Sequence, residues 1–203
     1  MSKKIWIAAI SAVLIVGVGV GSVIAVGSAN KGDSSNQNSV TQEDHDKVKK
    51  EVWKSYTELV AEYREELKKT GNYNGSGDAA IDDSVLESDA EIKANIDFEK
   101  ILLDLLKKKN LISKSITHES LDDLETYHEF ISTLCKLYND SDISLTTEEM
   151  VRIELRLEEA YSSLFNEKII AGDNYNEEEV LQLQKTIRDT IGLEEPDPNI
   201  THE

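Results

Sequence analysis

The sequence predicts an all-α protein in which an N-terminal transmembrane or signal helix precedes an amphipathic bundle of about five helices. Three observations support this fold class. One long apolar segment without charge lies near the N-terminus. Apolar residues then recur at steps of three and four, the spacing of one helix face. Proline, which breaks helices, occurs only at Pro196 and Pro198, and no stretch shows the alternating pattern of a β-strand.

Residues 5–26 form the apolar segment and contain no charged side chain. At a rise of ~1.5 Å per residue, a helix of this length spans about 33 Å, which matches a hydrocarbon core of ~30 Å. Lys3 and Lys4 precede the segment, and positive charge on one flank favours the cytoplasmic side. We therefore expect a single-pass cell-membrane protein with a cytoplasmic N-terminus and its C-terminal domain outside.

A cleaved signal peptide is the alternative interpretation of residues 1–29. Signal peptides carry a charged start, an apolar stretch and small residues at the cleavage site. Gly27, Ser28 and Ala29 provide such residues, and cleavage near Ala29 would release a secreted protein. Both interpretations place the rest of the chain outside the cytoplasm, and the length of the apolar stretch favours a retained signal anchor.

Three small residues within the apolar segment, Gly17, Gly21 and Ala25, recur at a spacing of four. This spacing places them on one face of a membrane helix, where two helix backbones can approach closely. Self-association through this face is a hypothesis, because glycine is common in membrane helices.

The remaining chain divides into three parts. Residues 30–40 are small and polar, which predicts a flexible tether. Residues 41–192 form the acidic helical bundle domain, and residues 193–203 form a tail that we expect to be disordered. Within the bundle, helices are expected over 41–71, from 84 or 88 to 110, from 120 to about 138, 146–172 and 176–192. Capping residues mark most of their starts.

Each expected helix has a single apolar face. These faces comprise Val48, Val52, Tyr56, Leu59, Val60, Tyr63 and Leu67; Ile92, Ile96, Phe98, Ile101, Leu102, Leu105 and Leu106; Leu121, Leu124, His128, Ile131, Leu134, Cys135 and Tyr138; Met150, Ile153, Leu157, Ala160, Tyr161, Leu164 and Phe165; and Val180, Leu183, Ile187 and Ile191.

The formal net charge of the chain is -18. A surface this acidic repels nucleic-acid phosphates and anionic lipid headgroups, so we expect no nucleic-acid partner. It suits a basic protein partner, although acidity also simply keeps a domain soluble.

Glu125 and His128 form a Glu-x-x-His pattern, which in di-iron bundles places a carboxylate and an imidazole on one inward face. That type of site needs a second such pattern, and no other histidine has a glutamate three residues before it. The pair is a weak candidate for a metal site, and we expect His128 instead to be partly buried.

A second weak candidate lies between the third and fourth expected helices, where Asp140, Asp142 and Glu149 occupy ligand positions of an EF-hand-like calcium loop. The pattern fails at two positions, because Tyr138 stands at the first ligand and Ile143 at the turn glycine. Acidic residues at this place also suit the start of a helix.

No catalytic motif is present, and we predict neither an enzyme nor a cofactor. The single cysteine, Cys135, lies on an apolar helix face, where cysteine behaves as a small hydrophobic residue. The sequence therefore predicts a membrane-anchored or secreted extracytoplasmic helical protein that acts as a binding or interaction module. Two alternatives are an accessory subunit of a membrane complex, and a metal-binding bundle or metal-dependent enzyme that uses Glu125 and His128.

Overall fold

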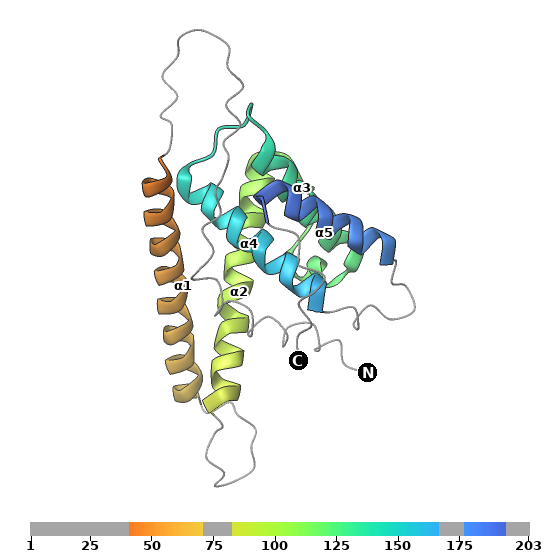
Figure 1. Cartoon of the computed structure of the whole chain (residues 1–203). Helices are drawn as coiled ribbons and strands as arrows, with labels where there is room; N and C mark the ends of the chain where they lie inside the picture. Colours follow the sequence, from red (N-terminus) through yellow and green to blue (C-terminus); the bar gives the residue numbers. More distant parts are fainter. Residues whose placement is uncertain (1–40, 71–82, 167–176, 194–203) are drawn as a thin grey trace, which may run out of the picture.

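The computed structural model describes residues 41–70, 83–166 and 177–193, which form α-helices and one short 3-10 helix. The elements are α1 (Gln42–Thr70), α2 (Asp83–Lys108), η2 (His118–Asp122), α3 (Leu124–Asn139), α4 (Thr147–Asn166) and α5 (Glu177–Ile191), shown in Figure 1. The prediction of an all-helical domain with five α-helices is confirmed for this part of the chain, which contains no strand.

The membrane segment 5–26, the small residues within it, the tether 30–40 and most of the tail 193–203 lie outside the described residues. Among the helices that the structure does describe, none combines the length and the apolar character needed to cross a membrane.

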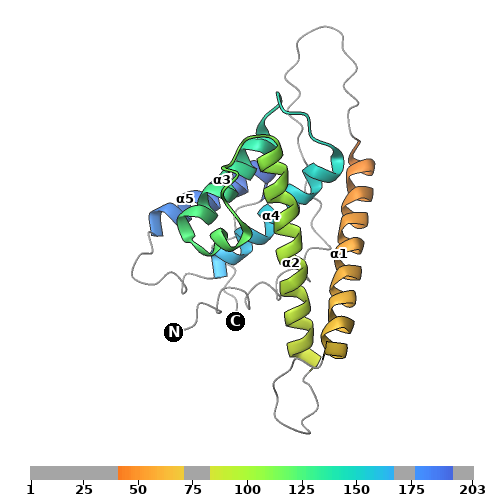
Figure 2. The same ribbon diagram turned by 180° about the vertical axis from the view of Figure 1, so that it is seen from behind.

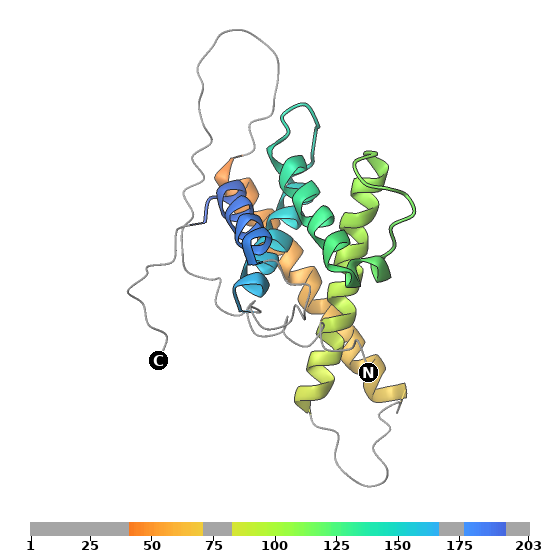
Figure 3. The ribbon, with the colours of Figure 1, turned by 90° about the vertical axis from the view of Figure 1, so that its right-hand side faces the viewer.

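α1 and α2 form an antiparallel hairpin. The Tyr56 hydroxyl donates to Asn95 Oδ1 at 2.8 Å, and the Arg64 guanidinium lies 3.0 Å from Glu87. Small residues allow the two helices to approach closely, since Ala90 and Ala94 are fully buried against Val60, Tyr56, Leu59, Tyr63 and Leu67. The half of the hairpin next to residues 71–82 projects beyond α3, α4 and α5, as Figures 1 and 3 show.

α4 is the central helix of the domain, because it contacts α1, α2, α3 and α5. The main core lies around it and is formed by Leu102, Leu106, Phe130, Ile131, Leu134, Leu137, Ile153, Leu157, Leu183 and Ile187, all nearly fully buried. Figure 2 shows α4 passing behind α2, with α3 and α5 beside it.

The third expected helix is interrupted in the structure. The 3-10 helix η2 contains Ser120, where the helix was expected to begin, and the chain then becomes extended at Asp123 before α3 starts. The Asp123 side chain accepts a hydrogen bond from the Thr126 amide at 3.0 Å, which caps α3. A local cap thus outweighed the continuous apolar spacing that predicted a single helix.

One face prediction was wrong in α2. Ile101 was expected in the core but is 48% exposed, whereas its neighbours Leu102 and Leu103 are buried. α2 packs on α1 and also on η2, α3 and α4. Its buried surface is therefore broader than a single stripe, and Ile101 lies outside it.

Candidate functional site

The most distinctive feature of the domain is a set of charged side chains buried along α4. Glu154, Arg156 and Glu159 are 6%, 3% and 9% exposed, and Glu158 is half-buried. Because helices surround α4, its polar residues cannot all face water. They are held instead in two groups of ion pairs, since burying a charge is costly unless it is paired.

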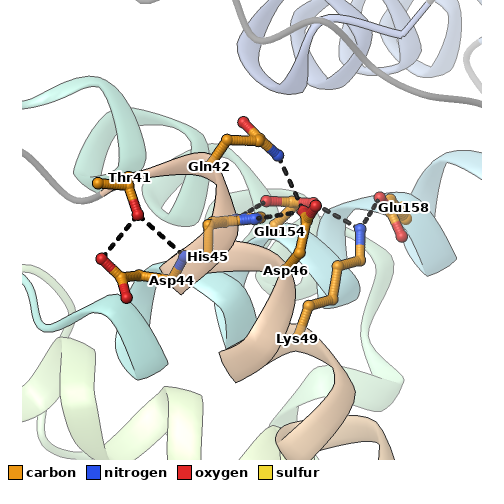
Figure 4. Close-up of polar contacts among 8 residues, drawn as sticks. All are labelled: Thr41, Gln42, Asp44, His45, Asp46, Lys49, Glu154 and Glu158. Carbon is orange, nitrogen blue, oxygen red and sulfur yellow. Dashed lines mark hydrogen bonds and ion pairs between the residues drawn. The ribbon is translucent and has the colours of Figure 1, made fainter.

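The first group, called here the α1–α4 cluster, consists of His45, Lys49, Glu154 and Glu158 (Figure 4). His45 Nε2 lies 2.8 Å from one carboxylate oxygen of Glu154, and Lys49 Nζ lies 2.6 Å from the other. Lys49 also donates to Glu158 at 2.8 Å. Because a carboxylate only accepts, His45 Nε2 carries the proton of its bond. These contacts join the first turns of α1 to α4.

Burial and the neighbouring charges shift the pKa values in this cluster. Burial alone lowers the pKa of Lys49, but hydrogen bonds to Glu154 and Glu158 outweigh it and leave that pKa raised. Burial raises the pKa of Glu158, and Lys49 offsets only part of the rise. Burial, together with the contact to Glu154, raises the pKa of Tyr138 to about 12. Glu154 is therefore surrounded by donors from α1 and α3.

The second group, called here the Arg156 cluster, joins α2, η2, α3 and α4. Arg156 forms an ion pair with Glu99, donates to Glu159 at 2.9 Å and donates to the Tyr127 oxygen at 3.1 Å. His118 Nε2 lies 2.7 Å from the second carboxylate oxygen of Glu99. The Arg156 guanidinium thus ties α2 and α3 to α4 through directional bonds, and His118 joins η2 to the same cluster through Glu99.

The two carboxylates of the Arg156 cluster shift in opposite directions. Burial alone raises the pKa of Glu99, but Arg156 and His118 outweigh it and leave that pKa lowered. Burial raises the pKa of Glu159, where Arg156 compensates only in part and Glu99 adds repulsion. The Oε1 atom of Glu159 is buried and has no hydrogen-bond partner in the part of the chain that the structure describes.

A groove of about 470 Å³ lies between α3 and α5 and is lined by His128, Ser132, Glu178, Glu179, Gln182, Leu183 and Thr186. Burial lowers the pKa of His128, and the charge of Glu179 opposes this in part. The Nε2 atom of His128 is buried and makes no hydrogen bond within residues 41–70, 83–166 and 177–193. A histidine in this setting is neutral at physiological pH.

The structure does not bring the first candidate pair together as a metal site. Glu125 is exposed on the first turn of α3, and the acidic residue that acts on His128 is Glu179 of α5. Within the described ranges, no group of three or more histidine, cysteine, aspartate or glutamate side chains has the geometry to hold a metal ion.

The residues of the calcium-like loop have local structural partners. Asp140 Oδ1 accepts a hydrogen bond from the Asp142 amide at 2.9 Å, which closes the turn after α3. Glu149 Oε2 accepts from the Thr146 amide at 2.8 Å, and the Glu149 amide donates to Thr146 Oγ1 at 3.1 Å. This reciprocal pair is a capping box at the start of α4.

Sequence reasoning missed the buried charges of α4. One signal was present, because Val151 and Leu155 lie outside the single apolar face that we assigned to this helix. Apolar residues on more than one side indicate a helix that is covered from several directions.

Comparisons with protein-family models, with curated proteins and with solved structures gave no match to this chain.

Proposed function

We propose that this protein is a single-pass, membrane-anchored module whose helical domain stands outside the cytoplasm and binds a basic protein partner. The apolar segment 5–26 and the preceding Lys3 and Lys4 support the anchor and its orientation. If the chain is cleaved near Ala29, the same domain is secreted.

The observation that carries the binding role is the projecting end of the α1–α2 hairpin, called here the arm and formed by residues 57–69 and 84–97. It extends beyond the other helices, at the end of α1 opposite to Thr41 (Figure 3). An anchored domain would therefore be able to present the arm away from the membrane.

The chemistry of the arm suits a basic partner. It contains eight acidic residues and four basic ones, and three of the basic residues are already engaged: Arg64 with Glu87, Lys68 with Glu65, and Lys93 with Glu66. Val85, at its tip, is 43% exposed and adds apolar surface. Interfaces commonly combine such an apolar contact with complementary charge.

The two buried clusters support this role by holding the base of the arm. The α1–α4 cluster fixes α1, and the Arg156 cluster fixes α2 through Glu99. A rigid base limits the conformational entropy that the arm loses when a partner binds. We therefore assign the buried charges to scaffolding rather than to chemistry.

The proposal is tested by crosslinking and capture of the full chain from membranes, with two matched variants. Glu58→Lys with Glu62→Lys reverses two exposed charges four residues apart on the arm. Glu125→Lys with Glu129→Lys makes the same change on exposed positions of α3. We expect a partner that the first variant loses and the second keeps. Equal capture by both variants, or equal loss, contradicts the assignment to the arm.

The anchor has its own test. We expect the full chain to stay with the membrane fraction after alkaline extraction and its mass to include residues 1–29. A mature protein that begins at Asn30 contradicts the anchor and leaves the secreted form.

A further inference from the structure

The C-terminal end of α2 carries a concentration of lysines in an otherwise acidic protein. Lys107, Lys108 and Lys109 are consecutive, and Lys114 follows in the connection to η2; we call these four residues the lysine end. Lys108 and Lys114 are exposed, and Lys107 and Lys109 are half-buried. No carboxylate of the described residues lies within 4.0 Å of any of the four ammonium groups, so their charge is available to an external anion.

Five other lysines of the domain lie within 4.0 Å of a carboxylate: Lys49, Lys54, Lys68, Lys93 and Lys100. Five more have no such partner among the described residues, but no two of them are adjacent in the sequence: Lys47, Lys50, Lys69, Lys136 and Lys185. The lysine end therefore differs by its concentration of positive charge. Lysines in the last turn of a helix complement the helix dipole, but Lys114 lies beyond α2, where that effect has fallen off.

Local structure holds the lysine end in place. Asn110 adopts a left-handed conformation with φ of 57°, which ends α2 and turns the chain. Lys109 Nζ donates to the Ser144 carbonyl at 3.0 Å and so joins this end to the loop before α4. That loop contributes Asp140 and Asp142, which reduce the positive potential nearby without pairing with the lysines.

The lysine end lies at the same end of the domain as the start of α1. Since α1 and α2 are antiparallel, the start of α1 and the end of α2 lie at one end of the hairpin, as Figures 1 and 2 show. Thr41 is covalently joined to the tether and, through it, to the apolar segment. If residues 27–40 form the flexible tether that their composition predicts, their mean end-to-end distance is about 20 Å, so an anchored domain keeps the start of α1 close to the bilayer.

We propose that the lysine end docks on anionic lipid headgroups of the membrane that holds the anchor. This inference rests on the proposed anchor. Lysine ammonium groups attract the phosphates of an anionic surface. Salt screens charges more than about 10 Å away, so the acidic arm at the far end does not cancel the attraction, whereas the exposed Glu43, Asp44 and Asp46 at the start of α1 reduce it. Docking orients the domain with the arm directed outwards. The lysine end would thus supply a local concentration of positive charge in a chain whose net charge is strongly negative.

The test uses the full chain inserted into vesicles of phosphatidylcholine, alone or mixed with phosphatidylglycerol. A Ser113→Cys substitution, in a Cys135→Ala background, carries a fluorescent donor beside the lysine end, and the lipid headgroups carry the acceptor. We expect more energy transfer in the anionic vesicles than in the neutral ones, and a loss of this difference at high salt. A donor at Glu62→Cys on the arm should show low transfer in both lipids.

Charge variants identify the groups responsible. Lys108→Glu with Lys114→Glu should abolish the lipid-dependent difference, whereas Lys69→Glu with Lys185→Glu changes the net charge equally and should preserve it. Circular dichroism checks that each variant is folded. If the chain does not float with either vesicle, the anchor itself fails. If it floats with both vesicles and the Ser113→Cys donor shows no difference between them, or if the lysine variant retains the difference, the docking proposal is overturned.

Discussion

Glu99 of α2 and Arg156 of α4 form an ion pair in the interior of the domain, although 57 positions separate them in the chain. The Arg156 side chain is only 3% exposed and that of Glu99 is 14% exposed. Arg156 also binds Glu159, and His118 occupies the other oxygen of Glu99. The pair therefore joins α2 and η2 to the central helix.

Removal of the guanidinium should destabilise the domain strongly. Arg156→Met leaves Glu99 and Glu159 buried without their cation, which costs about 3–5 kcal/mol of unfolding free energy. Urea denaturation measures this loss. The control is Arg152→Met, which breaks an i,i+4 pair with the exposed Glu148 and a cation–π contact with Phe98 and should cost about 1–2 kcal/mol. Equal losses in the two variants would contradict the role of the Arg156 cluster.

The two carboxylates bound by Arg156 should respond to pH with opposite signs. The pKa of Glu99 is lowered on folding, so its stabilising contribution is present above pH ~4.5 and is lost as the pH falls through the folded-state pKa. Glu99→Gln should therefore destabilise the protein at pH 7, and the deficit should shrink below pH ~4.5.

The pKa of Glu159 is raised, so ionising this group costs stability as the pH rises above ~4.5. Glu159→Gln should be as stable as the parent protein or more stable at pH 7, with the difference vanishing toward pH ~4.5. Urea titrations across this range measure both variants. The same sign of effect for Glu99→Gln and Glu159→Gln would refute the assignment.

Close contact between α1 and α2 should depend on small residues in the arm. Ala90 is fully buried against Val60, so Ala90→Leu should overpack the interface and cost about 1–3 kcal/mol. Thermal unfolding measures the loss, and hydrogen exchange should increase in residues 57–69. Ala61→Leu, on an exposed position of α1, is the matched control and should change little. A tolerated Ala90→Leu would show that the arm is not packed as described.

The loop before α4 should act as a cap and not as a calcium site. Thr146→Ala removes one half of the capping box with Glu149 and should cost about 1 kcal/mol. Ser141→Ala, in the same loop, should have little effect. Millimolar calcium should produce no binding heat and leave the melting temperature unchanged. A saturable heat that Glu149→Gln removes would establish the calcium interpretation instead.

Cys135 should react slowly with thiol reagents in the folded protein. The side chain is buried, and burial raises the pKa of the thiol, although Thr190 offsets this in part. The burial of the side chain and the raised pKa both reduce the amount of accessible thiolate, which is the reactive form. Modification should become rapid in urea. An added thiol at Ser113→Cys, on an exposed position, should react quickly without denaturant, and equally fast native labelling of Cys135 would show that it is accessible.

The sequence predicted the buried residues well for a helix that packs on one side and less well for a helix that is covered on several sides. All four residues expected on the inner face of α5 are buried: Val180, Leu183, Ile187 and Ile191. α5 contacts α3 and α4 from one side, so a single stripe describes it. α4 is covered from several sides, and its single predicted stripe omitted Val151, Glu154, Arg156 and Glu159, which are also buried.

The candidate sites were also limited by the fact that sequence spacing does not reveal contacts between helices. Glu125 and His128 share a short motif, but spacing within one helix does not reveal that His128 faces Glu179 of another. The acidic residues of the loop before α4 are explained by local turns and caps, which the sequence also indicated as the competing interpretation.

By itself, the sequence determined the all-helical class, the approximate bounds of α1, α2 and α5, the start of α4, and the acidic character of the domain. These properties depend on local spacing, capping residues and composition, all of which can be read directly from the sequence. Only the tertiary structure decided which charges are buried, that Glu99 meets Arg156, and that the lysine end and the start of α1 lie at the same end of the domain. The cost of burying a charge depends on which helices surround it and on the partner it finds, and those partners lie tens of residues away.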